Sequence, residues 1–182
     1  MHSRAHYFGN PIHPALITIP IGAYVASVVF DVFYLLDGDD PTWFTIAQYT
    51  LMLGIVGALL AAIPGFIDYL FIPRDWSAKV WGLIHAGLNL SATGLAIVSA
   101  VIRWGEAPET GSGEMWAARV LSWVAIGVAA ISGSIGGHLV YHNNIGNANY
   151  PKFHEASLTP QGTEQHKHTK EELASPPDSS SA

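Results

Sequence analysis

Four long apolar runs, separated by short polar segments, organise the chain, and they occupy residues 14–36, 45–72, 80–102 and 120–141. At a rise of about 1.5 Å per residue, each run is long enough to cross the roughly 30 Å hydrocarbon core of a bilayer as a helix. Polar residues gather between the runs and do not alternate with apolar ones inside them. The pattern therefore predicts an all-α, integral membrane four-helix transmembrane bundle.

The flanking segments complete the predicted organisation. We expect residues 1–13 to form a cytoplasmic N-terminal segment, 14–142 the four-helix transmembrane domain, and 143–182 a disordered cytoplasmic tail. The tail is rich in Pro, Ser, Glu, Lys and Gln, and such a segment cannot bury enough apolar surface to fold alone. The first run is too long for a signal-peptide core and no clear cleavage site follows it, so we expect it to be retained.

Composition narrows the class of protein. Only 12% of the residues are charged, about half the share of an average soluble domain. The absence of cysteine excludes disulfides, thiolate metal sites, iron–sulfur clusters and thiol nucleophiles. No basic face suggests nucleic acid, and no phosphate-binding loop, hydrolase triad or nucleotide fingerprint is visible. Whether the protein is an enzyme stays open, and a non-enzymatic role is favoured.

The distribution of lysine and arginine predicts the orientation. Six of the eight Lys and Arg residues fall on the side of the two termini, including Arg74 and Lys79 in the second connection. Arg103 and Arg119 fall on the other side, in a polar connection predicted for residues 103–119. The positive-inside rule therefore places both termini in the cytoplasm, and we expect a bacterial inner (plasma) membrane protein.

Five ionisable side chains are expected at a similar depth near the cytoplasmic ends of the helices. Charged and histidine side chains are costly inside a membrane, so they usually face the interior of a bundle and have a function. Asp31, near the opposite end, is expected to be a separate site or part of a structural pair. The five are His13, Asp68, His85, His138 and His142.

Helical periodicity assigns these residues to faces. His85, Asn89 and Thr93 form a polar stripe on the third run, and Ser134, His138 and His142 form another on the fourth. Small residues predict close packing: Gly133 and Gly137 on the fourth run, and on the second the residues Gly54, Gly57, Ala61, Pro64 and Gly65. Pro64 should also kink the second run.

Three motifs resemble one bacterial membrane family. They are Asn10-Pro11-Ile12-His13-Pro14-Ala15-Leu16, then Pro64-Gly65-Phe66-Ile67-Asp68-Tyr69, and Gly136-Gly137-His138-Leu139-Val140-Tyr141. Over residues 9–146 the chain is similar to the family catalogued as domain of unknown function 2231. Asn10 departs from its pattern, where a histidine is expected. Some members are joined to Rieske-type or cytochrome-type modules, so the resemblance implies a link to electron transfer.

The histidines suggest a ligand site. His85 and His138 are candidate axial ligands for a haem b between two helices, or ligands of a transition metal, with His13 as a third candidate. Asp68 and Asn89 would support them through hydrogen bonds. His138 and His142 also form a weak candidate metal pair on one helical face.

Simpler readings remain open beside the ligand site. In this second interpretation, the histidines serve only as interhelical hydrogen-bonding groups, which contribute about 0.6–2 kcal/mol in membranes, and Asp68 pairs with Arg74 or Lys79. The protein would then be a cofactor-free structural or partner-binding membrane subunit. A small proton-coupled transporter is disfavoured because no polar path continues through mid-membrane. Expected partners are the lipid bilayer and, beyond it, redox proteins or other membrane subunits.

Overall fold

The computed structural model describes residues 5–8, 10–37, 40–72, 77–104, 113–143 and 145. Within these residues the fold is all-α apart from one short strand pair, and four helices are long and apolar enough to span a membrane. The predicted fold class is therefore confirmed. Except for Asn143 and Ile145, the tail predicted to be disordered lies outside the described residues.

The first span consists of two helices that meet at Ile17, and the other three spans are single helices. Asp40 caps the second span by accepting a hydrogen bond from the backbone N–H of Thr42 at 2.8 Å, and Pro41 occupies the first helical position, where a missing N–H is tolerated. The elements are β1 (His6–Tyr7), β2 (Asn10–Pro11), α1 (Ile12–Leu16), α2 (Thr18–Leu36), α3 (Pro41–Leu70), α4 (Ser77–Trp104) and α5 (Gly113–Tyr141).

The connection predicted for 103–119 is wrong at both ends. Arg103 lies in the last turn of α4, and α5 already begins at Gly113, so that Arg119 is helical as well. Both arginine side chains are buried. The prediction failed because it treated each arginine as a group that must reach water, whereas Asp31 neutralises Arg103 inside the bundle.

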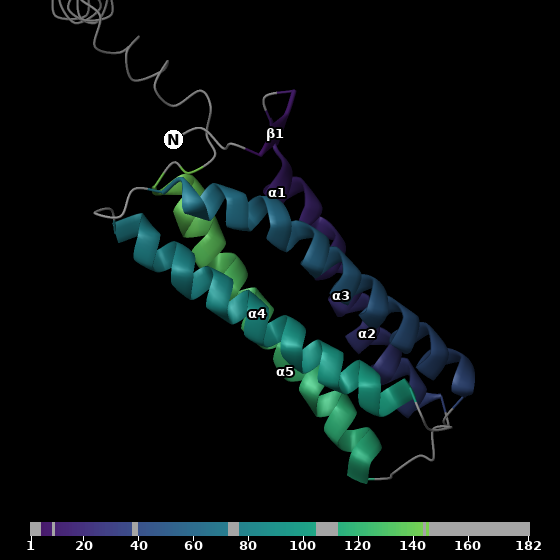
Figure 1. Cartoon of the computed structure of the whole chain (residues 1–182). Coiled ribbons are helices and arrows are strands. Elements are labelled where there is room, and N and C mark those ends of the chain that lie inside the picture. The colour runs from purple at the N-terminus through teal and green to yellow at the C-terminus, as the bar shows by residue number, and fades with distance from the viewer. Residues whose placement is uncertain are drawn as a thin grey trace, which may run out of the picture.

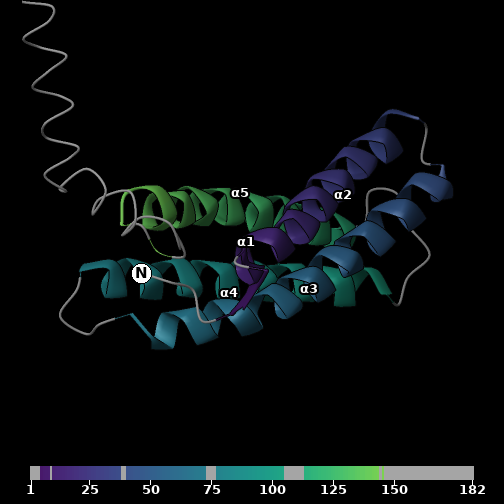
Figure 2. The ribbon, with the colours of Figure 1, turned by 90° about the horizontal axis from the view of Figure 1, so that it is seen from above.

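The helices form two hairpins. Helix α2 packs along α3, and α4 packs along α5 (Figures 1 and 2). Both hairpins start at the same end of the bundle, which Figure 1 places at the top with α1 and the last turns of α5. We call this the histidine end; it holds His13, His85 and His138. The opposite end, which holds Arg103 and Arg119, is the arginine end.

The two hairpins repeat one sequence pattern. Asp31 and Arg103 are 72 residues apart, and the same offset relates identical residues along the first helix of each hairpin. The second helices follow the same relation with an offset one residue shorter. The identical pairs relate the first span, α1 with α2, to α4, and they include His13 and His85, Leu16 and Leu88, Gly22 and Gly94, and Ser27 and Ser99.

Equivalent residues of the two hairpins make equivalent contacts. Ser27 Oγ donates to the carbonyl of Ala47 at 2.9 Å, and Ser99 Oγ donates to that of Ala118 at 2.6 Å. Both serines are fully buried. Because the two hairpins also run in the same direction, they are parallel repeats related by a pseudo-two-fold axis along the bundle.

Small residues allow the helices to approach closely. A Cβ atom on Gly57 would lie 2.8 Å from Ile19, and one on Gly54 would clash with the Tyr24 ring. The predicted small face of the second span is therefore confirmed. The patch predicted at Gly133 and Gly137 is wrong, since among the described residues no other helix lies within 4 Å of a Cβ at either position.

Candidate functional site at the histidine end

His13 projects from α1 onto α3. Its Nδ1 atom lies 2.7 Å from the carbonyl oxygen of Ala61, and its ring lies over Gly65, where a Cβ atom would be 2.8 Å from Nδ1. Pro64 has no N–H and disturbs the hydrogen-bond ladder of the preceding turn. The carbonyl that loses its helical donor is that of Leu60, so the Ala61 carbonyl accepts the His13 bond as an additional one.

His85 makes the same contacts in the second hairpin. Its Nδ1 atom lies 2.8 Å from the carbonyl oxygen of Ser132, and a Cβ atom on Gly136 would lie 2.8 Å from its Cε1. Ser132 Oγ also donates to the His85 carbonyl at 3.0 Å. The repeat therefore extends to the histidines: each ring lies over a glycine of its own hairpin and bonds the carbonyl four residues earlier.

These contacts define the tautomer of both rings. A carbonyl oxygen can only accept, so each Nδ1 atom must carry a proton. In the neutral ring, each Nε2 atom then keeps a lone pair. The two ring centroids are 6.2 Å apart and the ring planes are nearly perpendicular, at 87°. Two imidazoles of one tautomer, one from each hairpin, thus lie side by side.

Asn89 lies beside His85. Its amide nitrogen is 2.7 Å from Ser132 Oγ, 2.9 Å from the His85 carbonyl oxygen and 3.2 Å from His85 Nε2. An amide nitrogen has two protons for these three acceptors, and the two shorter bonds use them best. The lone pair on His85 Nε2 is therefore the least engaged of the three.

His138 and His142 lie apart from this pair. Both are exposed, and their rings stack with centroids 4.5 Å apart. The ring next to His85 in the described structure is that of His13. The predicted polar stripe through Ser134 is wrong as an interior face, because Ser134 is exposed and Ser132 faces α4 instead. The buried residues of α5 define which face of this helix points into the bundle, and Ser134 does not lie on that face.

Asp68 contacts the N-terminal segment. Its carboxylate accepts a bond from the backbone N–H of Ala5 at 3.3 Å, which fastens the β1–β2 pair to the end of α3. Lys79 donates to the Tyr69 carbonyl at 2.6 Å and lies over the Tyr69 ring. The other predicted partner of Asp68, Arg74, lies outside the described residues.

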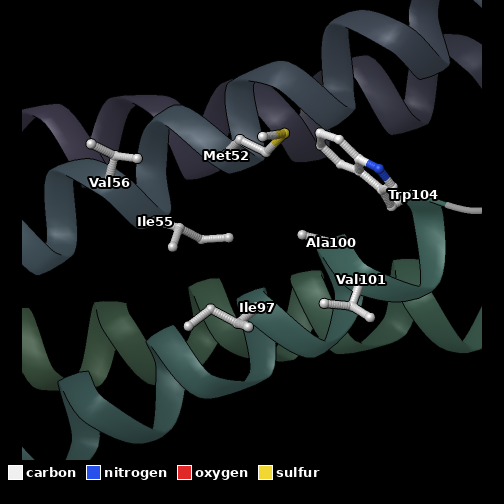
Figure 3. A pocket seen from close by; sticks show the side chains of 7 residues that line it. All are labelled: Met52, Ile55, Val56, Ile97, Ala100, Val101 and Trp104. Carbon is white, nitrogen blue, oxygen red and sulfur yellow. The ribbon is translucent and has the colours of Figure 1, made fainter.

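The histidine end offers a ligand pair and not a larger cage. Among the described residues, no group of three or more His, Cys, Asp or Glu side chains is placed to hold a metal ion. A pocket of about 500 Å³ lies elsewhere, between α3 and α4, and it is drawn in Figure 3. It is lined by aliphatic side chains, Met52 and the Trp104 ring, so it has no cluster of polar groups to orient a ligand.

One of the two alternatives predicted for Asp31 is confirmed at the arginine end, although its partner was not predicted. Asp31, expected to be a separate site or a structural pair, forms an ion pair with Arg103. Three further polar side chains are buried, Ser27, Gln48 and Thr93, and of these only Thr93 belonged to a predicted polar stripe. Each donates to a backbone carbonyl, of Ala47, Ala100 and Asn89 respectively, so these bonds do not link the side chains to one another.

These features define a multi-pass membrane protein with four spans in two repeated hairpins. The family described as "Predicted membrane protein (DUF2231)" matches residues 9–149 of the chain. The chain belongs to this family, which confirms the resemblance inferred from its three motifs. No curated protein and no solved structure matches the chain.

Proposed function

We propose that this protein binds one haem b between its two hairpins, with His13 and His85 as axial ligands, and takes part in electron transfer. The observation that carries the proposal is the shared tautomer. Each ring donates Nδ1–H to a backbone carbonyl, 2.7 Å away for His13 and 2.8 Å for His85, and so keeps Nε2 as a potential ligand. Ligating histidines usually have such an orienting partner.

The ligand count favours haem over a bare metal ion. A structural zinc ion takes four protein ligands and a catalytic one three, and the described residues present no such group. A porphyrin brings four nitrogen ligands of its own, so one or two protein side chains suffice for haem iron. Bound there, the iron would supply one-electron redox chemistry.

The repeat supports His13 as the partner of His85. His13 and His85 occupy equivalent positions of the two hairpins, so together they would hold one haem between the hairpins. Gly65 and Gly136 would hold the two rings against their own hairpins. His138, first considered as the partner, is exposed and stacked on His142. Asn89 and the two carbonyls would orient the rings, and Asp68 would anchor the N-terminal segment.

A difference spectrum tests the proposal. The protein is produced in cells supplied with a haem precursor, purified in mild detergent, and its dithionite-reduced minus oxidised spectrum is recorded. We expect a b-type haem band at about one haem per chain. His13→Ala and His85→Ala should each abolish or shift this band, whereas the matched control His138→Ala should leave it unchanged.

Two results would overturn it. A colourless protein that also fails to take up added haemin leaves the alternative, a cofactor-free membrane subunit in which the histidines fix the packing of the helices and a partner is bound elsewhere. A band that survives His13→Ala unchanged but disappears in His138→Ala would return the ligand pair to His85 and His138.

We further propose that both termini face the cytoplasm of a bacterial inner membrane. The support is the split of lysine and arginine, six of eight on the side of the termini. Redox partners would then meet the histidine end from the cytoplasm. A C-terminal fusion to a reporter that is active only outside the cytoplasm should be inactive, and a cytoplasmic reporter active; the reverse would invert the topology.

A further inference from the structure

Among the described residues, the arginine end buries two guanidinium groups, those of Arg103 and Arg119, and one carboxylate, that of Asp31. Arg103 is fully matched: its two terminal nitrogens each lie 2.7 Å from an oxygen of Asp31. Its Nε donates to Ser99 Oγ at 3.2 Å, and one terminal nitrogen also donates to Ser122 Oγ at 2.9 Å. The charge of Arg103 is thus cancelled and its donors are engaged.

The guanidinium group of Arg119 has neither a carboxylate nor a hydrogen-bond acceptor beside it among the described residues. Its side chain is fully buried, and within the described part of the chain none of its three guanidinium nitrogens has a hydrogen-bond partner. Its Cζ atom lies 4.7 Å from the centre of the Tyr34 ring and 5.5 Å from that of Trp116. Arginine does not lose its proton in proteins, so the positive charge stays.

The aromatic neighbours do not balance this charge. A cation–π contact contributes less free energy than is lost when an ion is buried without a partner. The repeat indicates that packing does not require a cation here. The equivalent position of the first hairpin is Gln48, a buried neutral amide that donates to the Ala100 carbonyl at 3.2 Å.

We propose that Arg119 is the binding residue of an oxyanion site that takes a phosphate group at the arginine end. A guanidinium group offers paired donors that match two oxygens of a phosphate. Arg119 lies in the second turn of α5, close to the arginine end of the bundle. The phosphate is that of a lipid headgroup or a free phosphate ion.

The test uses the full chain in detergent after lipid has been removed. Its unfolding midpoint is followed against two probes, inorganic phosphate and phosphatidylglycerol in mixed micelles, with diacylglycerol as the phosphate-free lipid. The variant is Arg119→Gln, which introduces the residue found at the equivalent position of α3. The control is Lys79→Gln, a cation at the histidine end.

We expect phosphate-bearing probes to raise the midpoint of the wild type and of Lys79→Gln, but not that of Arg119→Gln. Without a probe, Arg119→Gln should be at least as stable as the wild type, because an unpaired buried charge is removed. A response to both probes indicates any phosphate as ligand, and a response to the lipid alone indicates a headgroup site.

The proposal fails if neither probe moves the wild-type midpoint, or if Arg119→Gln responds as strongly as the wild type. Arg119→Lys provides a second variant should the first not fold. It keeps the charge but loses the paired donors, so its apparent affinity for phosphate should fall at least tenfold. Unchanged affinity in Arg119→Lys would also refute the proposal.

Discussion

Asp31 and Arg103 occupy equivalent positions in the two hairpins and carry opposite charges. Each terminal nitrogen of Arg103 lies 2.7 Å from a carboxylate oxygen of Asp31, and both side chains are fully buried. The pair joins α2 to α4 and therefore links one hairpin to the other. Removing either partner would leave the other charge without compensation.

Asp31→Asn should lower the stability of the bundle by about 3–5 kcal/mol, the usual cost of breaking a buried ion pair from one side. The double variant Asp31→Asn with Arg103→Gln should recover part of this loss, because no unpaired charge remains. Unfolding in detergent by heat or by a denaturing surfactant measures both. A double variant that is less stable than Asp31→Asn would contradict the assigned pairing.

Exchanging the two charges tests the repeat itself. In the double variant Asp31→Arg with Arg103→Asp, Ser27 would take the place that Ser99 has beside Arg103. The residue equivalent to Ser122 is Leu51, which cannot accept a hydrogen bond from the new arginine. We expect a stable bundle that has lost roughly one hydrogen bond to a charged group, about 1.5–3 kcal/mol. If the exchange is as harmful as Asp31→Asn alone, the two hairpins are not equivalent at this depth.

Gly65→Ala and Gly136→Ala should each displace one histidine ring. The added Cβ would lie 2.8 Å from His13 or His85, and overpacking of this kind costs about 1–3 kcal/mol. Thermal unfolding measures the loss, and a haem band, if present, should shift. The matched control is Gly87→Ala on α4, which meets no described atom within 4 Å and should be neutral or slightly stabilising.

The lowered pKa of the Asp40 carboxyl should make the stability of the fold depend slightly on pH. The backbone N–H of Thr42 lowers the pKa of the Asp40 carboxyl below its ordinary value of 3.8. Because the pKa is lower in the folded chain, the carboxylate stabilises the fold above pH 3.8 and this contribution is lost as the pH falls through the folded pKa. Asp40→Asn keeps a capping side chain that does not titrate.

The wild type should accordingly exceed Asp40→Asn in unfolding midpoint near neutral pH, and the margin should shrink below pH 3.8. Differential scanning in detergent at several pH values measures it. A margin that is the same at every pH would mean that the carboxyl titrates alike in the folded and unfolded chains.

The four spans were predictable because membrane helices need long apolar runs, and that requirement is local. The ends of α4 and α5 were not predictable from such runs. Arg103 stays inside the bundle because of a carboxylate 72 residues away, and hydropathy carries no information about such a partner.

The depth of the candidate site along the helices was predicted correctly, but the helix faces that carry it were not. Depth follows from counting residues inside a span, and it correctly grouped His13 with His85. Phase depends on which side of α5 is buried, and Ser134 and His138 proved to be exposed. The recurrence of a histidine, a glycine and a serine along the first span, α1 with α2, and along α4 was the available signal, since it pairs His13 with His85 directly.

The opposite charges of Asp31 and Arg103 bear on how such a chain could arise. A symmetric dimer of one hairpin would bring two aspartates, or two arginines, together at this position, and either meeting would repel. Once two copies were joined by gene duplication and fusion, each could mutate alone. The ion pair is thus available to the fused chain but not to a symmetric dimer of identical hairpins.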